Sequence, residues 1–222
     1  MLTTTLYYKD SMLTPADYSN LYDDNWLNDR CIDFYLEHLE SNLPIKEGSV
    51  IKPYLLRASM SFLVTNIEDT TYLSKALPNH IFSSDIIFIP VNNKQNLESF
   101  VGGSHWSLLV YVKANNKFLY YDSADNYNIR FAYKYSDKIS KVLGIEGNVE
   151  IMGTPQQING SDCGVYLLSI IGQLYQRIIE SSSYSNQVAF EEILKVDTQH
   201  VLPPSEMRQK IRELVKQLKN SK

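Results

Sequence analysis

The chain has 222 residues, a net charge of -4 at neutral pH and an isoelectric point near 5.6. This acidic balance argues against a nucleic acid or an acidic membrane surface as a partner held by bulk charge, and a basic protein partner is easier to accommodate. Hydrophobic residues make up 44% of the chain, enough to bury a full core, and the length favours a single domain over residues 1–222. We expect a monomer.

No long apolar segment stands out, and the N-terminal residues lack a basic region followed by an apolar stretch. The sequence therefore predicts neither a signal peptide nor a membrane span. Two cysteines, Cys31 and Cys163, could form one disulfide, but a single bridge in a chain of this size suits a reducing compartment better. We expect the protein in the cytoplasm, the nucleus or both.

The first clear element lies in residues 28–40, where apolar side chains recur at helical spacing. Asn28 is a suitable N-cap, and Pro44 follows soon after the end of the pattern. The pattern predicts a helix with one buried face.

Three apolar segments further along the chain are typical of neighbouring strands. They cover residues 86–91, 106–112 and 117–122. The second and third are joined by residues 113–116, whose two asparagines tolerate left-handed backbone angles and favour a tight hairpin. In a hairpin the start of one strand lies beside the end of the next, so His105 is expected near Asp122.

The pattern continues with a helix over residues 132–143 that ends at Gly144, and with a strand over 149–152. A long apolar helix is predicted from residue 162 to residue 179.

The C-terminal part begins with residues 181–186, which are polar and predict a loop, followed by a helical pattern over 187–194. A last amphipathic helix follows Pro203 and Pro204. Its apolar stripe is expected to close the core, and a membrane or a partner helix is the alternative.

Cys163 lies at the start of the long helix, behind a turn built by Asn159-Gly160-Ser161-Asp162. A helix N-terminus and a nearby imidazole both favour the thiolate, which is the nucleophilic form of cysteine. Asp162 is a candidate cap, and Gly164 leaves the backbone beside the thiol open. Taken alone, Cys163 is more simply explained as a small buried hydrophobe at a helix start.

His105 follows Gly102 and Gly103 at the mouth of a predicted strand. A carboxylate at Asp122 could bond one imidazole nitrogen and leave the other facing the thiol, as a catalytic triad requires. Without these neighbours His105 could be an ordinary, partly exposed histidine.

Gln157 lies six residues before Cys163. Across a turn it could direct an amide N–H toward the sulfur and stabilise the oxyanion of a tetrahedral intermediate. Gln156 could take this role instead, and either side chain could simply stabilise the turn. A thiol, a base, a carboxylate and an amide donor together indicate cleavage of an acyl bond.

These motifs resemble those of the Ulp/sentrin-specific proteases, a family of cysteine proteases that process ubiquitin-like modifiers. The matching residues are, in chain order, Trp26-Leu27-Asn28-Asp29, His105-Trp106, Asp122, Gln157 and Asn159-Gly160-Ser161-Asp162-Cys163-Gly164. The resemblance extends over essentially the whole chain and is greatest to the deneddylase members. Residues 45–77 and the C-terminal third match only loosely.

The resemblance implies an α+β, papain-like fold of the Ulp type, with a central mixed or antiparallel sheet flanked by helices and the catalytic cysteine at a helix N-terminus. It makes Cys163 the nucleophile, His105 the general base and Asp122 its orienting partner, and it places Gln157 in the oxyanion hole. It implies no metal and no organic cofactor. No histidine has a second ligand at a metal-binding spacing, so a zinc hydrolase is a poor competitor.

The resemblance also implies a substrate-binding site. Trp26 and Trp106 would line a narrow tunnel that admits only the Gly-Gly tail of a modifier, and Gly103 would let the substrate backbone approach. Asp29 would contact a basic residue near that tail. Without the resemblance, the tryptophans could equally belong to the core, and Asp29 would simply complement the dipole of its helix.

The implied partner is a ubiquitin-like modifier of the Nedd/Rub type, with its conjugates, and a SUMO-type modifier is the alternative. The leaving group would be a short C-terminal extension or a lysine side chain. Two other classes stay open: a module that binds such a modifier without cleaving it, and an acyltransferase that passes the thioester to an acceptor. The complete set of four catalytic residues argues against the first, and the lack of a cofactor-binding signature gives the second no support.

Overall fold

The computed structural model describes residues 2–94, 103–181 and 190–221, and its centre is a five-stranded sheet. The strands, in their order across the sheet, are β3 (Pro53–Leu55), β4 (Ile86–Asn92), β5 (Trp106–Val112), β6 (Lys117–Tyr121) and β7 (Asn148–Ile151). The pairs β3–β4 and β6–β7 are parallel, whereas β5 is antiparallel to both of its neighbours. The sheet is therefore mixed.

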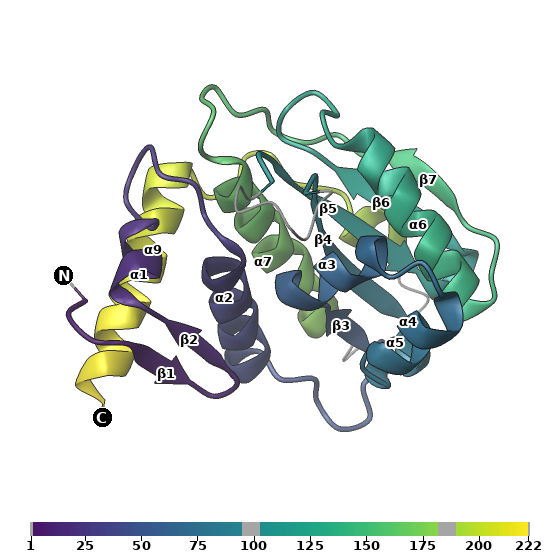
Figure 1. Cartoon of the computed structure of the whole chain (residues 1–222), viewed down its shortest axis with the longest axis horizontal. Helices are drawn as coiled ribbons and strands as arrows, with labels where there is room; N and C mark the ends of the chain where they lie inside the picture. Colours follow the sequence, from purple (N-terminus) through teal and green to yellow (C-terminus); the bar gives the residue numbers. More distant parts are fainter. Residues whose placement is uncertain (1, 95–102, 182–189, 222) are drawn as a thin grey trace.

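Helices cover both faces of this sheet, as Figure 1 shows. One face packs against α2 (Asp29–Asn42) and α7 (Cys163–Ser181), and the other packs against α3 (Ala58–Asn66), α4 (Thr70–Ala76) and α6 (Ile129–Leu143). Alternate residues of β4 serve opposite faces, so Phe88 belongs to the core with α7 and Ile87 to the core with α6. Every residue of β4 is buried, which explains why residues 86–91 form a continuous apolar run.

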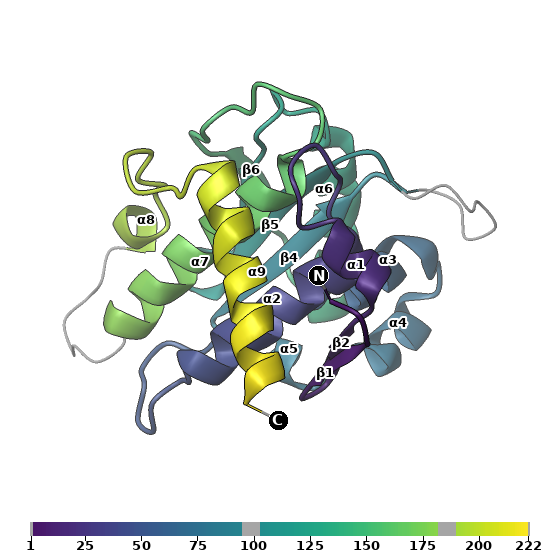
Figure 2. The same cartoon turned by 90° about the vertical axis from the view of Figure 1, so that its left-hand side faces the viewer.

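The C-terminal helix α9 (Pro204–Asn220) crosses the outside of α2 and α7 (Figure 2). Its buried residues Met207, Ile211 and Val215 join the core that contains α7. The predicted amphipathic helix is confirmed, and its stripe closes the core. Among the described helices, none combines the length and the apolar character needed to cross a membrane.

Short elements that the sequence pattern did not predict complete the fold. They are β1 (Leu6–Tyr8), β2 (Ser11–Leu13), α1 (Pro15–Ser19), the strand β3, the helices α3 and α4, and α5 (His80–Ser83). The strands β1 and β2 pair with each other and form a separate two-stranded sheet.

The predicted hairpin is confirmed. A 3-10 turn over Lys113–Asn115 joins β5 to β6, and Asn116 takes a left-handed backbone angle with φ of 52°. The register pairs Leu108 with Tyr121. His105, just before β5, and Asp122, just after β6, therefore lie at the same end of the hairpin.

Several predicted boundaries move in the structure. The helix α6 begins at Ile129 rather than at residue 132, and β7 covers residues 148–151 rather than 149–152. Ser181 belongs to α7 and not to the predicted loop, because the buried stripe of α7 continues through Ile178 and Ile179 into the last turn. The rest of that loop, at 182–186, lies outside the described residues. So do residues 187–189 of the following helical pattern, of which the structure describes α8 (Phe190–Ile193).

Candidate active site

The imidazole of His105 and the carboxylate of Asp122 meet at the end of the β5–β6 hairpin. Nε2 of His105 lies 2.5 Å from Oδ1 of Asp122, and both side chains are buried. The thiol of Cys163 lies next to the imidazole and, like Asp122, raises its pKa. The structure thus brings the predicted carboxylate, imidazole and thiol together in that order.

The carboxylate of Asp122 is fixed from several directions. Its Oδ2 accepts the Tyr120 hydroxyl at 2.5 Å and the Asn128 backbone N–H at 3.0 Å, and its Oδ1 also accepts the Ala124 backbone N–H at 2.9 Å. Burial alone would raise the pKa of Asp122. The hydrogen bonds from His105, Asn128 and Tyr120 outweigh burial and hold this pKa below its usual value, so the carboxylate is charged at neutral pH.

The charge state of His105 follows from the same contacts. Burial alone would lower its pKa, but the hydrogen bond with Asp122 and the neighbouring Cys163 raise the pKa to about 9. The ring is therefore cationic at neutral pH. A cationic imidazole held next to a cysteine is the setting in which thiols act as nucleophiles.

Cys163 is the first residue of α7 and is nearly fully buried. The carbonyl of Asp162 accepts the backbone N–H groups of Val165 and Tyr166, so the helix begins directly at the nucleophile. The side chain of Asp162, a candidate cap in the sequence, instead accepts hydrogen bonds from Asn159 and Arg208. Both cysteines of the chain are free.

A wall formed by Leu27 and Trp106 stands beside the nucleophile. A Cβ atom at Gly164 would lie 3.0 Å from Cβ of Leu27 and 3.3 Å from Cδ1 of Trp106. The indole N–H of Trp106 donates to the carbonyl of Leu27 at 2.9 Å. Only a glycine at position 164 lets this wall approach the start of α7 so closely.

The four residues predicted to bind substrate line one cleft of about 390 Å³, namely Trp26, Asp29, Gly103 and Trp106. Trp26 is 51% exposed, which excludes the interpretation of this residue as part of the core. Asp29 is exposed in the first turn of α2, where it complements the helix dipole and also faces the cleft.

Gly103 is the part of the predicted glycine pair that the structure describes, since Gly102 lies outside the described residues. A Cβ atom at Gly103 would collide with the side chain of Asn92. Packing within the protein therefore requires a glycine at position 103. Gly103 and Asn92, which lie close together here, both line the cleft.

The two glutamines before Cys163 have different surroundings. Gln156 is fully used as a brace: its Nε2 donates to the carbonyls of Asp122 and Thr154, and its Oε1 accepts the Asp125 backbone N–H. Gln157 accepts the Ser123 hydroxyl at 2.8 Å and donates from Nε2 to the carbonyl of Asn159 at 2.7 Å. An amide nitrogen carries two N–H groups, so Gln157 keeps a donor for another acceptor.

Sequence analysis missed three side chains that contact His105. Asn92 and Asn128 each donate from Nδ2 to the carbonyl of His105 at 3.1 Å. The ring of Tyr127 packs edge-on against the imidazole, with the ring centroids 5.5 Å apart. No local pattern marks these residues, because each meets His105 through the tertiary fold.

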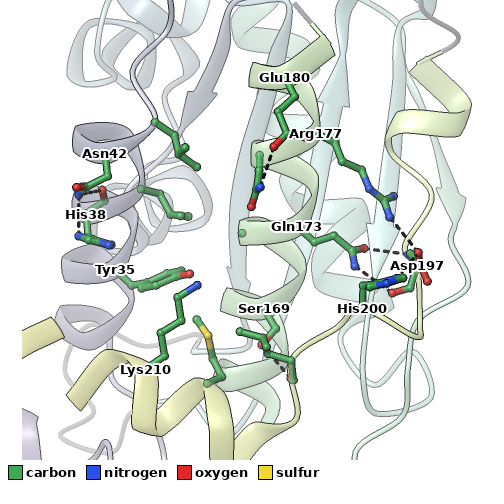
Figure 3. Close-up of a pocket in the computed structure, with 16 residues that line it drawn as sticks. Tyr35, His38, Asn42, Ser169, Gln173, Arg177, Glu180, Asp197, His200 and Lys210 are labelled. Atoms are coloured by element: carbon green, nitrogen blue, oxygen red, sulfur yellow. Dashed lines mark hydrogen bonds and ion pairs between the residues drawn. The ribbon is translucent and has the colours of Figure 1, made fainter. Parts of the chain in front are cut away.

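A second cleft, of about 600 Å³, lies between the C-terminal halves of α2 and α7 and contains none of the predicted site residues. Its polar side chains are largely bonded to one another, as Figure 3 shows for Asp197 with Gln173, Arg177 and His200. Within the described ranges, no group of three histidine, cysteine or acidic side chains could hold a metal ion.

Comparison with known proteins identifies the family. The sequence profile of the Ulp1 protease family, C-terminal catalytic domain, matches residues 25–203. The chain belongs to the Ulp1 protease family. It is a cysteine protease, as the sequence motifs predicted.

Two curated relatives of this family are similar over most of their length. "Probable sentrin-specific protease 8" of Dictyostelium discoideum is 31% identical over 201 residues, which cover 84% of this chain and 83% of that protein. "NEDD8-specific protease 1" of Arabidopsis thaliana is 38% identical over 167 residues, which cover 74% of this chain and 72% of that protein.

Solved structures confirm the Ulp-type fold. A de-sumoylating protease superposes with a TM-score of 0.65 at 19% identity, covering 98% of this chain and 92% of that chain. The Xanthomonas campestris effector XopD bound to ubiquitin gives a TM-score of 0.63 at 21% identity, covering 86% and 90%. At these identities the likeness concerns the fold alone. The predicted α+β architecture with the cysteine at a helix start is confirmed.

Proposed function

We propose that this Ulp1-family protease is a deneddylase that cleaves after the C-terminal Gly-Gly of a Nedd/Rub-type modifier. The catalytic part of the proposal rests on the hydrogen-bonded pair of Asp122 and His105 next to Cys163 at the start of α7. The choice of modifier rests on the relatives named NEDD8-specific protease 1 and probable sentrin-specific protease 8.

In the proposed mechanism, the Cys163 thiolate attacks the carbonyl carbon of the modifier's last glycine. The oxyanion that forms accepts a hydrogen bond from the free N–H of Gln157. His105, cationic at neutral pH, gives its proton to the leaving amine, and a thioester remains on Cys163.

Hydrolysis of the thioester completes the cycle. The neutral imidazole takes a proton from a water molecule, whose oxygen attacks the thioester carbonyl, and the sulfur leaves. Asp122 stays ionised throughout and holds Nε2 of His105, so that the opposite ring nitrogen faces the sulfur.

The cleft beside Cys163 is the proposed binding site of the modifier tail. Trp26 and Trp106 line this cleft, and Gly164 allows Leu27 and Trp106 to approach the start of α7. A residue larger than glycine at the end of the tail would meet the indoles. Replacing the modifier's terminal glycine by alanine is therefore expected to slow cleavage severely, and an unaffected rate would refute the tunnel.

A SUMO-type modifier is the second candidate, because a de-sumoylating protease and the Ulp1 protease domain in complex with Smt3 share this fold. The same catalytic residues would cleave either modifier. The two modifiers differ in their folded bodies, which would dock on the enzyme outside the cleft.

The test is capture of a panel of modifiers, each carrying an electrophile at its C-terminus, read by intact mass with Cys163→Ala as the control. Capture of the Nedd/Rub-type modifier alone supports the deneddylase. Capture of the SUMO-type modifier keeps the mechanism and overturns the choice of modifier. Absence of capture by a folded protein supports a binding module, and transfer of the modifier to an added amine in place of hydrolysis supports an acyltransferase.

A further inference from the structure

We infer that Arg208 of α9 is a positioning residue of the proposed reaction. Its guanidinium binds two parts of the site at once: the loop that contains Trp26, and Asp162, the residue before Cys163. The inference rests on the proposed function, since it assigns Arg208 to the geometry of that same site. Arg208 is 1% exposed and lies in the second turn of α9.

One side of the guanidinium holds the loop that follows α1. Its NH1 nitrogen donates to the carbonyls of Asn20 at 2.9 Å and Tyr22 at 2.8 Å, and NH2 donates to the carbonyl of Asn25 at 2.8 Å. The three carbonyls belong to the loop that leads directly to Trp26, and this loop passes beside the start of α9 in Figure 1.

The other side of the guanidinium binds the turn that precedes Cys163. Nε and NH2 of Arg208 both donate to Oδ1 of Asp162, at 3.1 and 2.7 Å, and NH2 also approaches the carbonyl of Ser161 at 3.4 Å. The second oxygen of Asp162 accepts the side-chain amide of Asn159 at 2.8 Å. All five N–H groups of the guanidinium therefore have an acceptor.

These contacts bear on the reaction because the loop has no regular secondary structure between Asn20 and Asn28. Asp24 in this loop takes a left-handed backbone angle, with φ of 63°. Side chains from other elements anchor this loop: Arg208 supplies three hydrogen bonds to the backbone before Trp26, Arg212 donates to the carbonyl of Leu21 at 2.6 Å, and Trp106 donates to that of Leu27. The guanidinium of Arg208 also fixes Asp162, so one group sets the cleft wall and the nucleophile relative to each other.

A lysine at position 208 keeps the positive charge but offers one ammonium in place of a planar fork with five donors. It cannot reach three carbonyls of the loop and Asp162 together. Arg208→Lys is expected to lower kcat/KM for cleavage of the modifier on the order of 100-fold, the loss that a 1 Å misplacement can cause. Alkylation of Cys163 by iodoacetamide, which needs no tail-binding wall, is expected to keep its rate.

The matched control is Lys138→Met. Lys138 is also a buried cation, and its Nζ donates to the carbonyl of Ile67 and to Glu68, on the other side of the sheet. This variant loses stability without touching the loop, and its kcat/KM is expected to stay near that of the parent. An equal fall in kcat/KM for both variants would reduce Arg208 to a stabilising residue and overturn the inference.

A double-mutant cycle with Trp26→Ala gives the second readout. If Arg208 acts through Trp26, then Arg208→Lys costs much less activity in the Trp26→Ala background than in the parent. Independent, additive losses would contradict this route. Should Arg208→Lys fail to fold, Asp162→Asn keeps one acceptor for the guanidinium, removes the charge pair and is expected to give the same selective loss.

Hydrogen exchange separates this inference from the proposed function, because it needs no substrate. The backbone amides of residues 20–26 are expected to exchange faster in Arg208→Lys than in the parent. In Lys138→Met the exchange rates of these amides are expected to equal those of the parent. Unchanged exchange in Arg208→Lys overturns the inference even if cleavage is observed. Faster exchange in a protein that captures no modifier leaves the coupling in place and removes the proposed function.

Discussion

The two cysteines of this chain occupy opposite kinds of environment. Cys31 is fully buried, its thiol donates to the carbonyl of Asp17 at 3.2 Å, and burial raises its pKa to about 12. Cys163 lies at the start of a helix, next to the imidazole of His105, whose pKa is raised to about 9. The thiolate is the reactive form of a thiol, so the thiol groups of Cys31 and Cys163 differ in reactivity.

This contrast predicts that iodoacetamide at about pH 8 modifies one site of the native protein. Intact mass is expected to show a single adduct on the parent and none on Cys163→Ala. Unfolding in denaturant exposes Cys31, and the parent then takes up two adducts. A native adduct on Cys31 would contradict the assignment.

The charge of His105 gives a prediction for its pKa. Asp122 and Cys163 both raise this pKa, with Asp122 as the larger contributor, to about 9. We expect NMR titration to give a lower pKa in Cys163→Ala and a still lower one in Asp122→Asn. The reverse order of the two variants would show that the thiol, and not the carboxylate, dominates.

The raised pKa of His105 also makes the stability of the folded protein depend on pH. The folded pKa of His105 lies above its ordinary value near 6.5, so the folded protein binds this proton more tightly than the unfolded chain. The resulting stabilisation is fully present below about pH 6.5 and is lost as the pH rises through 9. Denaturation of Asp122→Asn at a series of pH values is expected to show a smaller loss over this window than denaturation of the parent.

The turn around Asp122 explains why asparagine is no substitute at this position. The carboxylate accepts hydrogen bonds from one imidazole, one hydroxyl and two backbone N–H groups. An amide nitrogen in place of one oxygen would face these donors with another donor. Asp122→Asn is expected to lower kcat by about 10⁴, as in other triads, while circular dichroism stays that of the parent. Near-normal steady-state kinetics would remove Asp122 from the orienting role.

At the scale of elements, the contact between the start of α7 and the loop before α2 shapes the cleft. Leu27 and Trp106 come from loop and strand segments that are 79 residues apart, and a hydrogen bond joins them in front of Gly164. The start of α7 therefore has two functions. Cys163 presents the thiol, and Gly164 lets Leu27 and Trp106 pack close to the helix.

Gly164→Ala tests this arrangement. The added methyl group would press on Leu27 and Trp106 and displace the wall, so kcat/KM is expected to fall on the order of 100-fold. Gly160→Ala, in the turn just before α7, is the control, because a Cβ atom there would meet nothing within 4 Å. Equal kinetics for the two variants would show that the wall tolerates displacement.

At the scale of the whole molecule, the hairpin that carries the catalytic pair is stabilised by two cores, one on each face of the sheet. Phe88 of strand β4, beside the central strand β5, is fully buried and packs edge-on against Tyr175 of α7, with ring centroids 6.3 Å apart. The sheet and α7 therefore hold His105, Asp122 and Cys163 in one rigid frame.

Phe88→Ala is expected to lower the free energy of unfolding by about 3–5 kcal/mol, the usual cost of a large cavity. Phe82 is 41% exposed and serves as the matched control, with an expected change within about 0.5 kcal/mol. Denaturant unfolding of both variants measures the difference. A cost at Phe88 no larger than at Phe82 would show that this core does not support the sheet.

Much of the frame could be predicted from the sequence. The elements α2, β4, β5, β6, α7 and α9 carry long or regular apolar patterns, and the structure confirms each of them. The strands β1, β2 and β3 have three residues each, too few for a periodic pattern, and they exist because a partner strand pairs with them.

The sequence by itself determined a candidate triad of His105, Asp122 and Cys163, and the resemblance to the Ulp family placed Gln157 ahead of Gln156 as the amide donor. A hairpin with a tight turn brings His105 to Asp122, and a turn followed by a helix presents Cys163 behind Gln157. These are local relations that residue types and short spacings encode.

Only the tertiary structure decided which groups hold that site in place. Asn92 and Asn128 meet at the carbonyl of His105, and Arg208 reaches Asp162 across 46 residues and the loop before Trp26 across more than 180. Contacts of this kind leave no local pattern, because the chain between the two partners sets neither their distance nor their orientation. The packing of α9 against α7 fixes both.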